Sequence, residues 1–218
     1  MSYTYSVFRV PALTDCDLEK AGISGANKLM IVAHPDDDVI WGGAHLMEKG
    51  YFVVVVTNRS NTVRKKEFEK VLSATGNSGI ILSYPDKSFG RRDSWNHNKD
   101  GIRADLERII CCQHWDLIVT HNADGEYGHI HHKMTHSIVT DIFTEHRPEL
   151  DTDLYFFGKY YPVEEIGSVQ DELPRITPEQ LRFKEEMLKL YKSQSKVIAK
   201  LSHMNEFEDW ILFDGTNG

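Results

Sequence analysis

The hydrophobic residues of the chain form short continuous runs, and these runs alternate with segments whose apolar residues recur at helical spacing. The runs are typical of strands that a parallel sheet buries on both faces, and the spaced segments are typical of helices packed on that sheet. The predicted strands cover 28–34, 51–57, 79–82, 115–120 and 154–157, and the predicted helices cover 39–50, 61–75, 102–112, 129–145 and 178–201. This alternation predicts an α/β fold with a doubly wound, mainly parallel sheet and helices on both faces.

The length of the chain suits one hydrophobic core, so we expect a single domain over residues 1–218. Residues 1–27 are expected to form a strap over one face of the core, and 178–201 a long C-terminal helix. Polar loops are predicted at 83–100 and 158–175, and a last strand or packing segment at 207–213. Loops this long in a compact domain are usually functional or disordered, and the first follows a strand, where it would cover a site.

The strand order of doubly wound sheets predicts where a ligand binds. In their usual orders the first strand lies beside the fourth or another switch partner, where the direction of winding reverses, and ligands bind there outside the carboxyl ends of the strands. The loops that follow the strands at 28–34 and 115–120 are therefore expected to be neighbours.

The first of these loops begins with His34, Pro35 and three successive aspartates, Asp36, Asp37 and Asp38. In most dinucleotide-binding folds this turn is rich in glycine, so that a phosphate approaches backbone amides. An imidazole beside three carboxylates would instead repel a phosphate and attract a cation. The turn therefore predicts a site for a divalent metal.

The second loop is rich in histidine and runs from Gly125 to His136. His129 and His132 are three residues apart and share a face if the segment is helical. His132 and His136 are four apart and could share a face as well. Joined to the first loop, this segment brings at least two imidazoles to a carboxylate.

A catalytic zinc site needs three protein ligands and an open position for water. We therefore predict His34, Asp37 and His132 as the metal ligands. Asp36 is then left beside the metal without binding it, which is where a general base for water should lie. Two histidines and one carboxylate are also the ligands of non-haem iron oxygenases, so Fe²⁺ stays open beside Zn²⁺. Those oxygenases usually have β-barrel folds, which this chain does not predict.

Composition restricts the partners and the compartment. The chain has 25 basic and 33 acidic residues, a formal net charge of −8, which argues against nucleic-acid binding. The three cysteines form no disulfide framework, which favours a reducing compartment. No apolar run approaches the roughly 20 residues of a membrane span, and no signal peptide is evident. We expect a cytoplasmic protein without a membrane span, and a homo-oligomer stays open.

The sequence AHPDDD, Ala33 to Asp38, closely resembles the AHPDDE motif of the LmbE-like family of N-acetylglucosaminyl-phosphatidylinositol de-N-acetylases. GEYGHIHH, Gly125 to His132, resembles the second motif of that family, of the form HxxH after a later strand. RKKE, Arg64 to Glu67, and KEEMLKLYKSQ, Lys184 to Gln194, resemble weaker stretches of the family pattern. The resemblance spans roughly residues 28–194 and implies the Rossmann-like fold of that family.

The resemblance also implies a role for each motif residue. It implies that His34, Asp37 and His132 bind the metal and that Asp36 is the catalytic base. By the same resemblance, His129 polarises the substrate carbonyl or stabilises the tetrahedral intermediate. The resemblance further implies that Tyr127 stabilises the oxyanion and that Asp93 orients His129. Asp86 is the alternative to Asp93 in that role.

The chain departs from the family pattern at two places. Asp38 replaces the usual glutamate, and Ile130 and His131 replace the common Pro-Asp inside the second motif. The extra imidazole puts in question which histidine binds the metal. Helical geometry favours His132, because His131 would point about 100° away from the face of His129.

Together these features predict a zinc-dependent hydrolase that removes the acetyl group from an N-acetylated amino sugar, of the N-acetylglucosamine type, or from its conjugate. The alternatives are a non-haem iron enzyme with the same ligands and a non-catalytic sugar-binding domain of the same fold. Specificity is expected in the loops at 83–100 and 160–175, where Trp95, Tyr160 and Tyr161 could stack on a sugar ring or simply pack.

Overall fold

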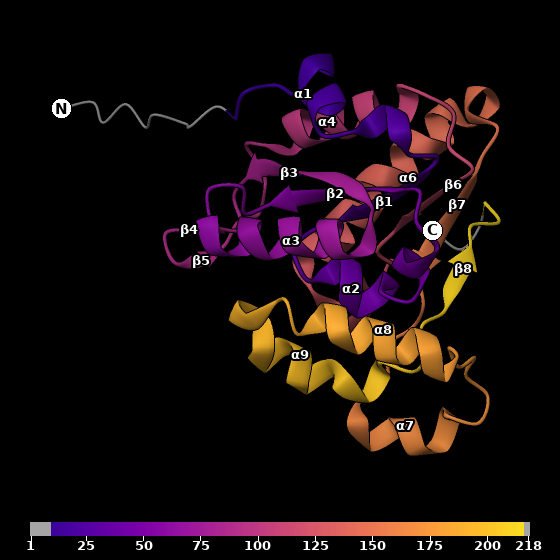
Figure 1. The fold of residues 1–218 in the computed structure, drawn as a ribbon. Coiled ribbons are helices and arrows are strands. Elements are labelled where there is room, and N and C mark those ends of the chain that lie inside the picture. Colours follow the sequence, from indigo (N-terminus) through magenta and orange to yellow (C-terminus); the bar gives the residue numbers. More distant parts are fainter. Residues whose placement is uncertain (1–9, 216–218) are drawn as a thin grey trace.

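In a computed structural model, which describes residues 10–215, a six-stranded sheet lies between two layers of helices (Figure 1). The strands are, in spatial order, β3 (Ser78–Tyr84), β2 (Tyr51–Thr57), β1 (Lys28–Val32), β6 (Leu117–Thr120), β7 (Asp153–Phe157) and β8 (Trp210–Leu212). All neighbouring pairs are parallel except β7 and β8, which are antiparallel. The predicted fold class is confirmed.

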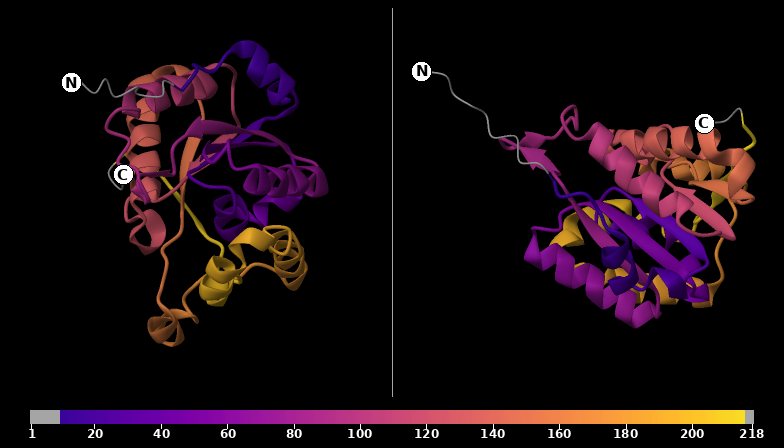
Figure 2. Two further views of the ribbon diagram at one scale, coloured as in Figure 1. Left: turned by 90° about the vertical axis from the view of Figure 1, so that its left-hand side faces the viewer. Right: turned by 90° about the horizontal axis from the view of Figure 1, so that it is seen from above.

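Helices cover both faces of the sheet, as Figure 2 shows from two further directions. One layer holds α1 (Asp15–Lys20), α4 (Lys99–Cys111) and α6 (Ile130–Leu150), and the other holds α2 (Asp37–Gly42), α3 (Thr62–Thr75), α8 (Pro178–Leu188) and α9 (Ser195–Leu201). Alternate residues of β1 enter opposite cores: Leu29 and Ile31 pack with the first layer, and Met30 and Val32 with the second. All four are completely buried, which explains why β1 is apolar throughout instead of alternating.

The direction of winding reverses between β1 and β6, which are the first strand and the fourth predicted strand. Their register pairs Lys28 with Leu117 and Ile31 with Thr120, so both strands end at the same edge of the sheet. The two loops that follow them therefore leave the sheet side by side, as the sequence predicts.

The helix predicted over 39–50 is wrong in its extent. It begins earlier, as α2, ends at Gly42, and gives way to a short 3₁₀ helix, η2 (His45–Glu48). The backbone N–H groups of Ala44 and His45 donate to the Glu208 carboxylate at 3.0 and 3.1 Å, so they do not continue the helical ladder. A Cβ on Gly43 would also lie 2.6 Å from the Val39 carbonyl oxygen, which shows how tightly the chain turns there.

The long helix predicted over 178–201 is also wrong, because it divides into α8, the 3₁₀ helix η3 (Lys192–Gln194) and α9. Side chains of other elements hold the chain at the break. The Tyr191 hydroxyl donates to the Asp38 carboxylate at 2.8 Å, and the Ser193 N–H donates to Glu67 at 2.8 Å. These tertiary bonds replace helical ones.

The two predicted loops contain short elements that their polar composition does not reveal. The first contains the hairpin β4 (Lys87–Ser88) and β5 (Arg91–Arg92), and the second contains α7 (Val163–Val169). The second motif begins with a short helix, α5 (Gly125–Gly128), and η1 (Ile23–Gly25) and η4 (Ser202–Met204) are 3₁₀ turns. The part of the N-terminal strap at 1–9 lies outside the described residues. Among the helices of 10–215, none combines the length and apolarity that crossing a membrane requires.

Candidate metal centre and active site

The first loop turns sharply where β1 ends. Asp36 precedes α2 with φ 126°, a conformation that costs a non-glycine residue roughly 1–3 kcal/mol. The turn is held by the Asp37 N–H, which donates to the His34 carbonyl at 3.3 Å, and by the His34 N–H, which donates to Asp37 Oδ2 at 2.8 Å. His34 and Asp37 are thereby placed against each other in the protein interior.

The second loop turns through left-handed backbone at Gly125 (φ 64°) and Glu126 (φ 53°). A Cβ on Gly125 would lie 2.8 Å from Lys133 Cγ, so the position requires glycine. Asn122 closes the turn, since its side chain accepts from the Glu126 N–H and its N–H donates to Glu126 Oε1, both at 3.0 Å. The turn directs the Glu126 carboxylate inward, where its side chain is fully buried.

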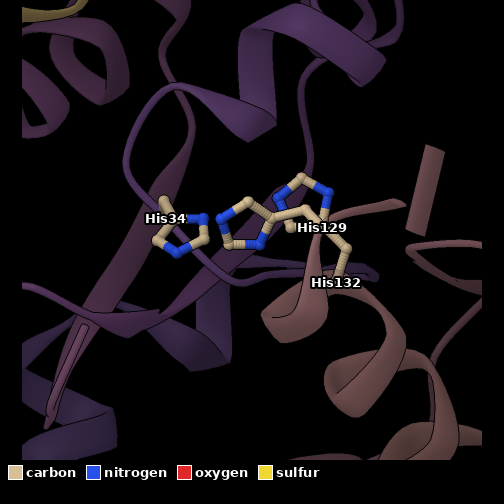
Figure 3. A group of neighbouring side chains, drawn as sticks. All are labelled: His34, His129 and His132. Carbon is tan, nitrogen blue, oxygen red and sulfur yellow. The ribbon is translucent and has the colours of Figure 1, made fainter. Parts of the chain in front are cut away.

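The two loops meet at one carboxylate oxygen. Asp37 Oδ2 lies 3.1 Å from His34 Nδ1 and 3.3 Å from His132 Nε2. Ligand atoms at about 2.0–2.1 Å from a tetrahedral zinc stand about 3.3 Å from one another, so both spacings suit such an ion. The imidazoles of His34, His129 and His132 converge from the two segments (Figure 3). The structure brings the three predicted metal ligands together.

The hydrogen bonds of His132 leave one ring nitrogen for a metal. Its Nδ1 bonds the Glu126 carboxylate, which accepts only, so the ring carries its proton on Nδ1. Its Nε2 is buried without a hydrogen-bond partner and faces Asp37. A carboxylate behind one nitrogen and no protein partner for the other are the arrangement of histidines that ligate metals.

His121 supports this arrangement and contributes no free nitrogen. Its Nδ1 lies 3.0 Å from Glu126 Oε2, and its Nε2 accepts the Ala33 N–H at 3.0 Å. Its ring stacks on His132 with centroids 3.8 Å apart. His121 therefore fixes the position of Glu126 and of His132, although it also lies 3.6 Å from Asp37 Oδ2.

The charges of the centre call for a cation. Burial alone would lower the pKa of His132, but Asp37 and Glu126 raise that pKa to about 10, so without a metal the ring holds a second proton on Nε2, which a bound cation would displace. Burial alone would raise the pKa of Glu126, but His121 and His132 lower it to about 2. The pKa of Asp37 is likewise held well below its usual range by His132 and His34 despite burial. Two ionised, buried carboxylates with an unpartnered nitrogen between them fit a divalent metal.

Asp36 directly precedes Asp37 in this turn and is buried as well. Its carboxylate pairs with the Arg64 guanidinium at 2.5 Å, and Arg64 also donates to the Pro35 carbonyl. Burial raises the pKa of Asp36 well above its usual value, the charge of Asp37 adds to this, and Arg64 opposes it. A buried carboxylate with a raised pKa has the affinity for protons that a general base needs.

His129 is held as a neutral hydrogen-bond donor. Its Nδ1 accepts the His131 N–H at 3.2 Å and so caps α6, which places the ring proton on Nε2. Burial and the neighbouring His132 lower its pKa to about 2. Tyr127 lies nearby, with its ring 6.0 Å from that of His129, and is 39% exposed. Burial raises the pKa of Tyr127, so its hydroxyl keeps its proton.

Asp93 takes a different place from the one expected. Its carboxylate accepts from the Ser88 hydroxyl and from the Trp95 N–H, and among the described contacts it has none with His129. Its backbone carbonyl instead accepts from His131 Nε2 at 2.8 Å. Asp86, the competitor, lies nearer the centre, with Oδ1 3.4 Å from His34 Nε2.

Sequence reasoning did not single out Glu126, His121 or Arg64 as site residues. His121 carried a usable signal, because it follows Thr120 directly at the carboxyl end of a core strand. Glu126 carried none, since its inward direction depends on left-handed backbone that the sequence does not mark at a glutamate.

Residues 29–143, which include both loops, match the family described as PIG-L, GlcNAc-PI de-N-acetylase, and they make up more than half of the chain. The chain belongs to the PIG-L family. Family membership supports a hydrolase of N-acetyl amides.

Two relatives differ in how much of their length this PIG-L protein spans. An uncharacterised protein of Acanthamoeba polyphaga mimivirus is 28% identical over 193 residues, covering 78% of this chain and 83% of the viral protein. A 1D-myo-inositol 2-acetamido-2-deoxy-alpha-D-glucopyranoside deacetylase of Corynebacterium kroppenstedtii is 24% identical over 174 residues. That match covers 58% of this chain and 45% of the bacterial protein.

Two solved structures resemble this PIG-L protein in fold. The N,N'-diacetylchitobiose deacetylase from Pyrococcus horikoshii has a TM-score of 0.59 and 15% identity, covering 91% of this chain and 88% of that one. An antimicrobial pseudoaglycone deacetylase has a TM-score of 0.56 and 19% identity, covering 80% of this chain and 85% of that one. At these identities the likeness supports the α/β fold alone.

Proposed function

We propose that this PIG-L protein is a metal-dependent hydrolase that removes the acetyl group from an N-acetylated amino sugar or its conjugate. The observation that carries the proposal is the single Asp37 oxygen that lies between His34 and His132, together with His132 Nε2, which is buried and has no hydrogen-bond partner. Zn²⁺ suits these ligands, and Fe²⁺ is the alternative ion.

The substrate class is supported by the family and by its named members. The family description names a GlcNAc-PI de-N-acetylase, the bacterial relative is named for a 2-acetamido sugar, and one structural neighbour is named for diacetylchitobiose. These substrates share an acetamido group on a sugar ring. We infer that this chain also cleaves such an amide, of the N-acetylglucosamine type.

The centre supplies the catalytic groups in separate places. A divalent metal held by His34, Asp37 and His132 would supply a Lewis acid and a more acidic water ligand. Asp36 accepts the proton of the attacking water, for which its burial and raised pKa suit it. Arg64 keeps the Asp36 carboxylate in place through the turn. The protonated Asp36 then returns the proton to the departing amine, which leaves acetate and a free amino sugar.

The oxyanion of the tetrahedral intermediate needs hydrogen-bond donors. His129 presents Nε2–H because its other nitrogen caps α6, and Tyr127 presents a protonated hydroxyl at the partly exposed mouth of the site. Losing one such donor typically lowers the rate roughly 10²–10³-fold. The half-buried ring of Tyr160 lies 6.0 Å from the partly exposed ring of Tyr127, so these two aromatic rings are available to stack on a sugar.

The proposal is tested by metal analysis of the purified chain and an amine-release assay on a panel of acetamido sugars. The Asp36→Asn variant should keep the metal and the fold but lose roughly 10²–10⁴-fold in kcat, the usual contribution of a general base. Asp124→Asn is the matched control, because Asp124 is exposed in the second loop.

Three outcomes would count against this function. Normal turnover by Asp36→Asn would remove the base. Absence of amine release with Zn²⁺ and with Fe²⁺, despite bound metal, would favour a sugar-binding domain. Oxygen consumption with Fe²⁺ and a keto-acid would favour the non-haem iron alternative.

A further inference from the structure

His131 stands where the family motif commonly has aspartate, and it lies between the metal centre and the loop at 83–100. It is completely buried. Its Nδ1 lies 3.1 Å from His34 Nε2, its Nε2 lies 2.8 Å from the Asp93 carbonyl oxygen, and its ring stacks on Trp95 with centroids 4.3 Å apart. Both nitrogens of a buried imidazole are thus occupied by specific partners.

The order of these bonds determines where each proton lies. A backbone carbonyl can only accept, so His131 must carry its proton on Nε2. A neutral imidazole carries one proton, so with that proton on Nε2 the Nδ1 that faces His34 is an acceptor. The bond between the two rings then requires that His34 donate from Nε2. The remaining nitrogen of His34, Nδ1, then faces Asp37 Oδ2 at 3.1 Å with a lone pair on each atom, an arrangement that a cation between them would complete.

We propose that His131 is a positioning residue: it donates to the Asp93 carbonyl from Nε2 and accepts from His34 at Nδ1. These two bonds fix the proton of His34 on Nε2 and leave His34 Nδ1 free to bind the metal. The proposal rests on the proposed metal-dependent function. It gives Asp93 a role through its backbone and gives the loop at 83–100 a role in building the centre.

The loop is constructed to hold that carbonyl in place. The Asp93 carboxylate accepts from Ser88 and from the Trp95 N–H, and the Trp95 indole N–H donates to the Pro85 carbonyl at 2.8 Å. Trp95 is completely buried and has φ 54°, so the loop maintains a strained residue under the ring of His131. Because these bonds keep the Asp93 carbonyl in one position, His131 keeps its proton on the nitrogen that faces this carbonyl.

Asp86 is close enough to His34 and His131 to allow two alternatives to the hydrogen bond between their rings. Its Oδ1 lies 3.4 Å from His34 Nε2 and 3.6 Å from His131 Nδ1, so these three groups could accept a second cation or share a proton differently. The same Asp86 oxygen already pairs with Arg92, which satisfies its charge. A cation at His34 Nε2 would also require His34 to bind metal through both nitrogens, which a neutral imidazole cannot do. The hydrogen bond to His131 is therefore favoured.

Two variants separate the hydrogen bond from the packing. His131→Phe keeps a ring to stack on Trp95 and removes the acceptor, whereas His131→Asn places Oδ1 where the imidazole has Nδ1 and removes the ring. Each protein is characterised by the ¹⁵N spectrum of its histidine side chains, in the metal-free and Zn²⁺-loaded forms, and by competition with a chelator for Zn²⁺.

In the wild type we expect the proton of His34 on Nε2, with one Zn²⁺ per chain. His131→Phe should lose the defined His34 tautomer and bind Zn²⁺ roughly 10–100-fold more weakly, as for other partners of metal ligands. His131→Asn should keep the tautomer and lie within about threefold of wild type.

The opposite pattern, a weakened Asn variant beside a normal Phe variant, would mean that the ring only packs. A wild-type spectrum with the His34 proton on Nδ1 would overturn the proposal without any variant, and two Zn²⁺ per chain would assign His131 to a second metal. Because these readouts do not use turnover, failure of the deacetylase assay would leave the tautomer test intact.

Discussion

Two buried ionic clusters of this protein differ in whether their charges are complete. The first is the Lys184–Glu208 pair, in which Lys184 Nζ lies 2.8 Å from Glu208 Oε2 with side chains 1% and 0% exposed. Glu208 also accepts from Ala44 N–H, His45 N–H and the His45 ring. Its one negative charge faces one positive charge, and its oxygens are fully bonded.

The second cluster is the candidate metal centre, where Asp37 and Glu126 flank His132 and no lysine or arginine of the described residues pairs with either carboxylate. One nitrogen there is buried and unpartnered. Other buried polar atoms of the described residues also have no partner, but this nitrogen belongs to a ring that lies between two buried carboxylates, so a cation is the partner that suits it. The difference teaches that a complete buried pair joins elements of the fold, whereas an incomplete one marks a ligand site.

The largest expected effect is loss of the metal. Exhaustive chelation should lower kcat by at least about 10³-fold, because a Lewis acid contributes several kcal/mol and each 1.4 kcal/mol is tenfold. Adding back Zn²⁺ or Fe²⁺ should restore activity, and the assay is amine release. Full activity after chelation would mean that the second cluster, like the Lys184–Glu208 pair, needs no cation from outside the chain.

Next in size is the break of the complete pair. Lys184→Met leaves Glu208 buried without its cation and should lower the free energy of unfolding by about 3–5 kcal/mol. Urea denaturation measures it. The matched control is Lys184→Met with Glu208→Leu, which removes both charges and should be much closer to wild type. Equal losses in the single and double variants would mean that packing, and not charge, stabilises this region.

A smaller effect is expected at the support of the metal centre. Glu126→Gln keeps the shape of the side chain but removes the charge behind His132, and should weaken metal affinity roughly 10–100-fold. Chelator competition measures the affinity. Glu179→Gln, an exposed change in α8, is the control. Unchanged affinity in Glu126→Gln would show that this carboxylate only packs.

The smallest effect concerns acid stability. Burial alone would raise the pKa of Glu208, but Lys184 and His45 lower it. A depressed folded-state pKa means that the pair contributes fully above the unfolded value, about 4.3, and that this contribution disappears as the pH falls through the folded value. As the pH falls below about 4, the free energy of unfolding of the wild type should therefore decrease more than that of the variant carrying both Lys184→Met and Glu208→Leu. Parallel curves from pH 7 to 3 would contradict this.

The sequence predicted best what depends on pattern. The apolar runs of β1 and β2 located the sheet, and the motifs that follow β1 and β6 identified two loops that the structure brings together. It failed where tertiary bonds decide the backbone. Nothing local marks the end of α8 at Leu188, because the break depends on Tyr191 reaching Asp38 across the molecule.

The contacts of Asp93 and Glu126 escaped prediction for different reasons. Asp93 acts through a main-chain oxygen, which every residue has, so its identity carries no signal for that contact. Glu126 depends on a positive φ that residue type does not announce. The motifs predict the candidate ligands, whereas the groups that would orient them depend on turn geometry.

β2, α3, β3 and α4 separate β1 from β6 along the chain, although β1 and β6 are neighbours in the sheet, so the two halves of the proposed metal centre come from segments far apart in the sequence. A segment containing the first motif alone has two of the three proposed ligands and none of the support from Glu126. Metal binding therefore requires both halves of the sheet. An N-terminal fragment ending before β6 is expected to release the ion, and a complementary fragment that supplies β6 and α6 is expected to restore binding.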